Sequence, residues 1–269
     1  MPELPELKVM RRQIVNHTIG KRIVDFKIYN LKLRGGEASD FVGKTIGVYL
    51  KEIFVLGKTL VVKLASSYYI LANLQSTGFF VLATSTETIK NIRAEFIFAD
   101  NSRLLFVDNR ANSYFQLMNQ KQLNQAMLEI GIDPLSKEFS YEIFVDLLRR
   151  RTTSIKNLLT NDKVFLGLGK VYSNEICFEA RVKPDKGIKE LRPAEIKRIY
   201  SAIKKVLKKS LEYDGLSFYL PVSNKQLRFD GFLNVYNREG QKCRRCQVGV
   251  IQKAKTGQSA LYFCPLCQP

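Results

Sequence analysis

The chain of 269 residues begins with the stretch MPELPEL, in which Pro2 stands directly before Glu3. One interpretation is a helix start, because proline fits a first helical turn and an acidic side chain suits the positive helix end. The other interpretation is chemical. Removal of Met1 would give Pro2 a free secondary amine, and an α-amino group with a pKa of about 8 is partly neutral and nucleophilic at neutral pH. These seven residues alone leave both interpretations open.

Four of the five cysteines form a second pattern with chemical potential. They make two C-x2-C pairs, Cys243 with Cys246 and Cys264 with Cys267, with seventeen residues between the pairs. Such pairs place four thiolates tetrahedrally about one Zn²⁺, and the length between them suits a β-hairpin. Because protein would fill all four positions, the predicted zinc is structural. The fifth cysteine, Cys177, is predicted to be a small buried apolar residue.

The charge of the chain favours a polyanionic partner. It has 43 Lys and Arg residues against 25 Asp and Glu, a formal net charge of +18, whereas a net charge of about 2–8 is enough to keep a small domain soluble. A phosphate backbone attracts such a chain and releases counterions on binding. No apolar run approaches a membrane span, and the first residues lack the apolar stretch of a signal peptide. We therefore expect a cytoplasmic protein that binds nucleic acid, no membrane association, and zinc rather than disulfides at the cysteines.

Strands dominate the first half of the sequence, behind a helix predicted over residues 5–15. Short runs rich in Val, Ile, Phe and Tyr, separated by Gly, Asn, Asp and Ser, favour a two-layer antiparallel β-sandwich. The predicted strands cover residues 45–55, 58–65, 68–74, 79–85, 94–100 and 103–108. This sandwich with its flanking helix must position Pro2 and Glu3.

Helical periodicity replaces the strand pattern after a turn-rich stretch near residue 135. Ser140 is a predicted N-cap of the first helix in this half. Two shorter helices flank the stretch VFLGLG, and a longer one over residues 192–213 has an apolar face. The residues of that face are Ile196, Ile199, Ile203, Val206 and Leu207. The fold class predicted from both halves is α+β.

Several motifs then coincide in one order along the chain. They are MPELPE, a Gly57–Lys58 pair before a strand, VDNR ending at Arg110, GIDPL, GLGKVYSNE, and a four-cysteine finger ending in CPLCQ. In this order the chain resembles the formamidopyrimidine-DNA glycosylase family (Fpg/Nei, the helix–two-turn–helix glycosylases) over essentially its whole length. The resemblance implies a β-sandwich catalytic domain at 1–131, a linker at 132–138, a helix–two-turn–helix DNA-binding domain at 139–231 and a zinc finger at 232–269.

The same resemblance implies a reaction. The family excises oxidised bases from damaged double-stranded DNA and cleaves the abasic site by β-elimination, after which δ-elimination can follow. Pro2 would be the nucleophile and Glu3 the general acid and base. Glu6 would support the amine, or be a first-turn helix acid. Lys58 would hold a phosphate beside the lesion, or be an ordinary turn lysine.

For DNA binding, the resemblance points to Arg110 and to the loop Gly167-Leu168-Gly169. The backbone N–H groups of that loop, together with the start of the next helix, would grip a phosphate. The other predicted contacts with the DNA backbone are Lys156, Lys170 and Tyr172. A plain interhelical turn is the alternative for this loop. We also expect one structural zinc ion, a monomer, and association with the bacterial nucleoid when the protein is on DNA.

Four positions depart from the family pattern. Lys170 stands where the family has Asn, and Ser259 where the finger has Arg. The residues that fill the space left by an everted base are typically a Met, an Arg and a Phe. Here Ser76 takes the Met position and Asn112 the Phe position, whereas Arg110 is kept. Small polar side chains are poor wedges for an unstacked duplex.

Two hypotheses follow from the kept and the altered residues. The first is an active bifunctional glycosylase and AP lyase with an atypical lesion preference, strongest on abasic or unpaired sites. The second is a catalytically weak or inactive relative that binds damaged DNA. Tyr114 is a possible substitute for the missing wedge, and the lesion-capping loop at residues 214–230 is also altered.

Overall fold

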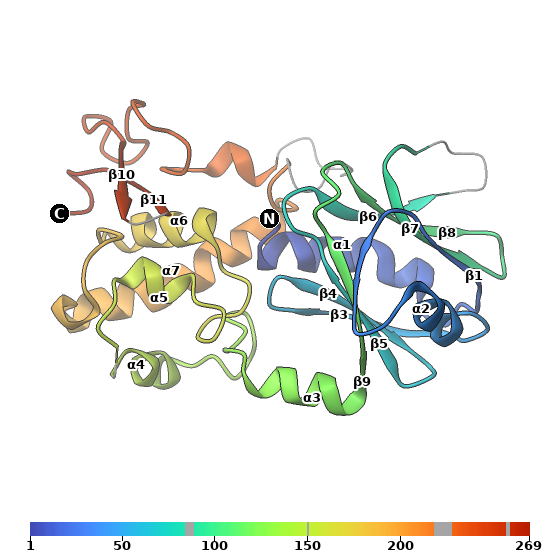
Figure 1. Ribbon diagram of the computed structural model, residues 1–269. Helices are drawn as coiled ribbons and strands as arrows, with labels where there is room; N and C mark the ends of the chain where they lie inside the picture. Colours follow the sequence, from blue (N-terminus) through green and yellow to red (C-terminus); the bar gives the residue numbers. More distant parts are fainter. Residues whose placement is uncertain (84–88, 150, 218–227, 257–258) are drawn as a thin grey trace. The chain divides into compact units, whose positions relative to one another are not determined.

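The computed structural model describes residues 1–83, 89–149, 151–217, 228–256 and 259–269 (Figure 1). The chain divides into two compact units. Of the described residues, unit 1 holds those within 1–129 together with Ser217, and unit 2 holds those within 130–216 and 228–269. The finer division at residues 131, 138 and 231 stays a prediction. In the described parts of the chain, no helix has both the length and the apolar character needed to cross a membrane.

Unit 1 is a β-sandwich, which confirms the predicted fold. Its first sheet has the strand order β1 (Ile23–Ile28), β7 (Ile92–Phe98), β8 (Arg103–Asp108), β6 (Gly78–Ala83). Its second sheet has the order β2 (Lys32–Arg34), β9 (Tyr114–Asn119), β5 (Tyr68–Asn73), β4 (Thr59–Leu64), β3 (Leu50–Leu56). One pair differs from the antiparallel expectation, because β2 and β9 are parallel. A parallel pair needs a long crossover connection, and most of unit 1 lies between these two strands in the sequence.

Aromatic side chains from both sheets form the core between the layers. Phe80 of β6 and Phe106 of β8 have ring centroids 5.0 Å apart, and Phe106 lies 4.9 Å from Phe115 of β9. All three side chains are buried. Because β6 and β8 belong to one sheet and β9 to the other, these contacts hold the two layers face to face.

The helices of unit 1 were only partly predicted. Helix α1 (Leu4–Thr18) confirms the first predicted helix. Helices α2 (Ala38–Thr45) and α3 (Gln120–Leu128) were not predicted, and the strand predicted from residue 45 begins at Leu50. Only two side chains of α2 are buried, Phe41 and Thr45. A helix with so few buried positions leaves no clear repeat of period 3.6 in the sequence.

Unit 2 begins with helices and ends with a β-hairpin. Its elements are α4 (Tyr141–Arg149), α5 (Ile155–Leu159), α6 (Lys170–Ala180), η1 (Ile188–Glu190), α7 (Pro193–Glu212), η2 (Phe229–Phe232), β10 (Gln252–Thr256) and β11 (Ser259–Phe263). The predicted N-cap is confirmed, since the Ser140 hydroxyl accepts the N–H of Ile143 at 3.3 Å. Four residues of the predicted apolar face of α7 are buried, and Ile196 is half-buried. Cys177 is fully buried, as predicted.

Candidate functional site

The first predicted site lies at the start of α1. Pro2 is buried and immediately precedes Glu3, the N-cap of the helix. The backbone N–H of Glu3 donates to the Glu6 carboxylate at 2.9 Å, and both acidic side chains are almost completely buried. The positive end of the helix stabilises negative charge here. The helix-start interpretation is therefore correct, and the same geometry gathers two carboxylates beside Pro2.

Lys58 lies in the two-residue turn that joins β3 to β4. Leu56 pairs with Thr59 across this turn, and Gly57 has a φ of 62°, a left-handed conformation that glycine adopts without strain. The Arg11 guanidinium of α1 donates to the carbonyl of Ile53 in β3 at 2.6 Å. Figure 1 draws the β3–β4 turn toward the end of the sandwich at which α1 begins. Lys58 and the start of α1 thus both belong to unit 1, in which α1 contacts strand β3.

Arg110 lies in the loop that follows β8, and its side chain is exposed. In the same loop, the Asn112 amide donates to the hydroxyl of Ser76 at 3.4 Å. The structure therefore brings together Ser76, Arg110 and Asn112, which lie in two separate loops of the sequence. Tyr114 lies within β9 under the guanidinium of Arg34, 3.7 Å from the ring centroid. This strand position does not support Tyr114 as a substitute wedge.

In unit 2, the loop between α5 and α6 presents a helix N-terminus. Gly167 has a φ of 73°, and its N–H donates to the Asp162 carboxylate at 3.2 Å. Gly169 is the N-cap of α6, and Lys170 is its exposed first residue. The N–H groups of a helix start form a natural anion site. Gly169 and Lys170 both lie at this helix start, and their contact with a phosphate stays a prediction.

The other two predicted DNA contacts of unit 2 have buried side chains. Lys156 and Tyr172 are both 0% exposed. The Tyr172 hydroxyl shares a hydrogen bond of 2.5 Å with Ser210, and its ring stacks on Phe229 at 5.6 Å. Neither side chain is exposed in the free protein, and their contact with the DNA backbone stays a prediction. Helix α6 buries nearly all its residues, which the short motif by itself does not reveal.

Sequence reasoning missed two polar residues of α6. Asn174 and Glu175 are both buried. The Asn174 side-chain oxygen accepts the N–H of Tyr262 in β11 at 2.9 Å, and the Glu175 carboxylate accepts the backbone N–H groups of residues 234–236, each at 2.9 Å. Both residues end the motif GLGKVYSNE, but the motif by itself does not show which groups they bind. These bonds fix the start of the finger against α6.

The four cysteines of the finger converge on one point. Their sulfur atoms all lie within 4.8 Å of one another, and the Cys243–Cys267 and Cys246–Cys264 pairs are both 3.8 Å apart. A tetrahedral site with Zn–S bonds of about 2.3 Å requires sulfur atoms about 3.8 Å apart. The cluster thus fits one structural zinc ion.

Groups around the cysteines support this fit. The N–H of Gly249 donates to the Cys246 sulfur at 3.2 Å. Backbone N–H groups of Gly249 and Val248 lower the pKa of Cys246 to about 6, which favours its thiolate, whereas burial raises the pKa of Cys264 and of Cys267. A Cβ atom at Gly249 would lie 2.7 Å from the Cys264 sulfur. The backbone therefore approaches the sulfur atoms as closely as only glycine permits.

Ser259 opens strand β11 and pairs with Thr256. Most of the predicted lesion-capping loop, residues 218–227, lies outside the described residues.

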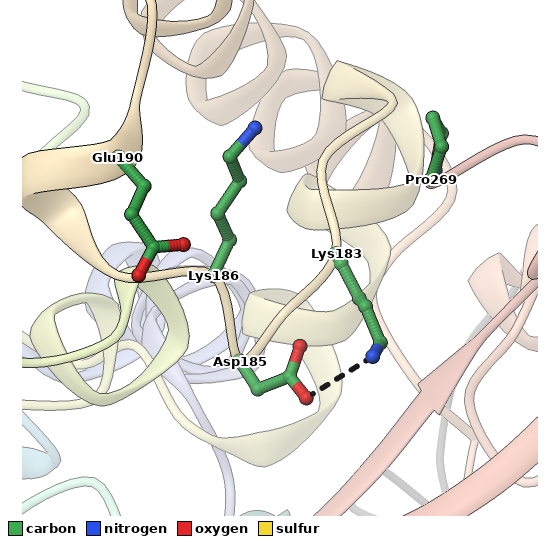
Figure 2. Close-up of a pocket in the computed structure, with 5 residues that line it drawn as sticks. All are labelled: Lys183, Asp185, Lys186, Glu190 and Pro269. Carbon is green, nitrogen blue, oxygen red and sulfur yellow. Dashed lines mark ion pairs between the residues drawn. The ribbon is translucent and has the colours of Figure 1, made fainter.

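Unit 2 also contains a polar pocket of about 350 Å³ (Figure 2). Its lining residues are Lys183, Asp185, Lys186, Glu190 and Pro269. Lys183 points toward Asp185 and forms an ion pair of 3.4 Å, and Lys186 forms another with Glu195 at 2.9 Å. The pocket includes no site residue predicted from the sequence, and its charges are balanced.

Unit 1, a β-sandwich, and unit 2, a helical unit that ends in a four-cysteine hairpin, together define the class of protein, an α+β protein of the helix–two-turn–helix kind. The family model of the formamidopyrimidine-DNA glycosylase N-terminal domain matches residues 1–115, and that of the formamidopyrimidine-DNA glycosylase H2TH domain matches residues 130–220. Over both of its units, the chain belongs to the formamidopyrimidine-DNA glycosylase family.

Individual relatives agree over the whole length. Formamidopyrimidine-DNA glycosylases of Pelotomaculum thermopropionicum and Acidothermus cellulolyticus are both 31% identical to this chain. Both matches cover 100% of this chain, and they cover 99% of the first relative and 98% of the second. The solved complex of Lactococcus lactis Fpg (MutM) with Fapy-dG-containing DNA superposes with a TM-score of 0.89 at 27% identity, covering 99% of both chains. A complex of the same organism's Fpg with abasic-site DNA gives the same values.

Proposed function

We propose that this protein is a base-excision-repair DNA glycosylase with AP lyase activity, which removes oxidised bases from double-stranded DNA. The observation that carries the proposal is the position of Pro2 directly before the N-cap of α1, beside two buried carboxylates. Relatives of the same length are formamidopyrimidine-DNA glycosylases, and solved relatives are bound to DNA with an abasic site or Fapy-dG. The basic charge of +18 agrees with such a partner.

The proposed reaction begins with the amine of mature Pro2. Its lone pair attacks C1′ of the damaged nucleotide, and the base leaves with the electrons of the glycosidic bond. The nitrogen then loses its proton and the C1′–O4′ bond breaks, with O4′ taking up a proton, which gives an iminium ion with no proton on nitrogen. Its positive charge therefore persists at any pH. This charge acidifies the C2′ proton, and loss of that proton expels the 3′-phosphate. Hydrolysis of the iminium restores Pro2.

Glu3 and Glu6 have different places in this proposal. Glu3 is the nearest carboxylate in sequence to the amine, so we assign it the proton transfers that open the sugar and accept the C2′ proton. The Glu6 carboxylate already accepts the N–H of Glu3 at 2.9 Å. We therefore assign Glu6 the task of fixing Glu3 and the start of α1.

Phosphate binding is assigned to both units. Lys58 and Arg110 serve unit 1, and Gly169 and Lys170 at the start of α6 serve unit 2. Lysine binds phosphate as a point charge, so Lys170 suffices where a fitted amide is missing. Cys243, Cys246, Cys264 and Cys267 would hold the zinc ion, which stabilises the finger and leaves no open position for chemistry. A monomer in the bacterial cytoplasm, associated with the nucleoid on DNA, completes the proposal.

The test is borohydride trapping on a duplex with an abasic site. The mature protein should give a covalent complex that disappears in Pro2→Gly and Glu3→Gln variants. Intact-mass measurement must first show that Met1 is removed, because an acylated proline nitrogen has no reactive lone pair. A correctly processed protein that binds the duplex but never becomes trapped refutes the enzymatic proposal.

One observation favours a second candidate, a binding protein for damaged DNA. Ser76 and Asn112 are small and polar, and they hydrogen-bond to each other at 3.4 Å. If the chain binds damaged DNA in a salt-dependent manner without cleaving any lesion or abasic duplex, this second function replaces the first.

A further inference from the structure

Asp108 is a fully buried carboxylate at the end of β8. One of its oxygen atoms accepts the Thr77 hydroxyl and the N–H of Arg110, the latter at 3.1 Å. The other oxygen accepts the N–H groups of Asn112 and Ser113, both at 2.9 Å. The donors are thus three backbone N–H groups and one hydroxyl group. Both oxygen atoms of Asp108 are used to shape the loop that carries Arg110.

The same carboxylate joins this loop to a second one, residues 74–78. Thr77 belongs to the second loop, and the Ser113 hydroxyl donates to the carbonyl of Leu74 at 2.9 Å. The N–H of Gly78 donates to that carbonyl at 2.8 Å. A Cβ at Gly78 would lie 2.6 Å from the Leu74 oxygen. The two loops therefore form one close-packed cluster, which we call the paired loops (residues 74–78 and 108–113).

Each of the paired loops contains a backbone conformation that needs support. Ala111 has a φ of 53° and Gln75 a φ of 47°, both in the left-handed region that non-glycine residues rarely adopt. Such conformations persist only where surrounding contacts fix them. Ala111 lies between two residues whose N–H groups donate to Asp108, so these bonds are the contacts that hold it.

The Asp108 carboxylate keeps its negative charge although it is buried. Burial raises its pKa, but hydrogen bonds from Thr77, Ser113 and Arg110 outweigh burial and hold the pKa below its usual value. The carboxylate is therefore ionised at neutral pH and accepts from all four donors. The exposed Arg110 side chain projects from a backbone that this carboxylate has fixed.

We propose that Asp108 is a positioning residue that fixes the paired loops, so that Arg110 meets damaged DNA in a preset arrangement. The inference rests on the proposed function, because it takes Arg110 as a contact with DNA. A fixed loop loses less conformational entropy on binding than a mobile one. Asp108 thus acts on DNA only through Arg110.

The test is a double-mutant cycle on DNA binding. The dissociation constant is measured for a duplex with a non-cleavable abasic-site analogue, using the wild type, Asp108→Asn, Arg110→Ala and the double variant. Asparagine keeps the size of the side chain but replaces one accepting oxygen with an NH2 group. We expect Asp108→Asn to weaken binding about tenfold, the loss typical of a hydrogen bond to a buried charge. The double variant should bind about as weakly as Arg110→Ala alone, because positioning has no effect without the residue positioned.

A purely structural role of Asp108 predicts a different result. The two substitutions would then weaken binding by factors that multiply, and this outcome overturns the inference. Glu95→Gln is the matched control, since Glu95 is a buried carboxylate of β7 that accepts from Arg103 at 3.0 Å and from Tyr29 at 3.1 Å, outside the paired loops. It should lower the melting temperature without changing binding or its salt dependence.

Thr77→Val covers the case in which Asp108→Asn does not fold. It removes one donor to the carboxylate and should weaken binding about threefold, again only when Arg110 is present. The cycle measures binding only, on a duplex that cannot be cleaved. If the wild type binds this duplex but cleaves no lesion or natural abasic duplex, the enzymatic proposal is refuted and the cycle still decides the role of Asp108. A wild type that does not bind the duplex refutes both.

Discussion

The carboxylate of Glu175 in α6 accepts the backbone N–H of Val235 at 2.9 Å. It also accepts the N–H groups of Asn234 and Tyr236 at the same distance. These residues lead into the zinc finger, whereas Gly169, the N-cap assigned to phosphate binding, stands at the other end of the connection, directly before α6. One buried acid therefore connects the finger to the helix that presents the phosphate site.

Glu175→Gln should destabilise unit 2 by about 2–3 kcal/mol, because an amide cannot accept at both atoms and its NH2 group would face a backbone N–H. The measurement is thermal unfolding at matched zinc content. Glu179→Gln is the control, since Glu179 is partly exposed and pairs with Lys205 and Arg245; it should cost about 1 kcal/mol or less. Equal losses for the two variants would contradict the role given to Glu175.

Gly249→Ala should reduce zinc retention. The new Cβ would lie 2.7 Å from the Cys264 sulfur, so the backbone or the sulfur must move out of tetrahedral geometry. The zinc released to a competing chelator reports the effect, and we expect release at a lower chelator concentration than in the wild type. Gly43→Ala is the control, because a Cβ there meets nothing within 4 Å. Zinc retention equal to that of Gly43→Ala would show that the four-cysteine site tolerates a methyl group at position 249.

Ser76 and Asn112 of the paired loops allow a prediction of increased activity. Ser76→Met combined with Asn112→Phe should increase excision of a paired oxidised base relative to cleavage of a preformed abasic site. Apolar wedges stabilise an unstacked duplex, and the N–H of Asn112 that Asp108 accepts is a backbone group that phenylalanine retains. The ratio of the two single-turnover rates is the measurement. An unchanged ratio would mean that the polar pair does not limit base eversion.

Acid should destabilise unit 2 through Glu195. Burial raises the pKa of this group, but hydrogen bonds and ion pairs with Arg192 and Lys186 outweigh it and lower the pKa to about 2. A lowered pKa in the folded state gives stability that is fully present above the unfolded value, about 4.5, and is lost as the pH falls toward 2. We expect a loss on the order of 1–2 kcal/mol, reduced from the full shift by solvent at the exposed Arg192.

Chemical denaturation of the wild type and Glu195→Gln at pH 7 and pH 3 tests this assignment. The variant should be less stable at pH 7 and should lose less stability than the wild type on acidification. The same pH dependence in both proteins would assign the acid sensitivity to other carboxylates.

Local patterns in the sequence were enough for much of the fold. The strand runs, α1, the N-cap at Ser140 and the paired cysteines each depend on residues close together in the chain, so their periodicity or spacing predicts them. Helix α2 was missed for the same reason, because its two buried side chains, Phe41 and Thr45, leave too weak a pattern. The family followed from the order of short motifs.

Tertiary structure alone decided which polar residues have partners and which side chains reach the surface. Lys156 and Tyr172 are buried in the free protein. Asp108 and Glu175 stand inside the motifs VDNR and GLGKVYSNE, but no motif shows that their carboxylates organise two loops and the start of the finger. The physical reason is sequence separation. Glu175 and Val235 are 60 residues apart, and Ser113 and Leu74 are 39 apart, so these bonds exist only after the chain has folded.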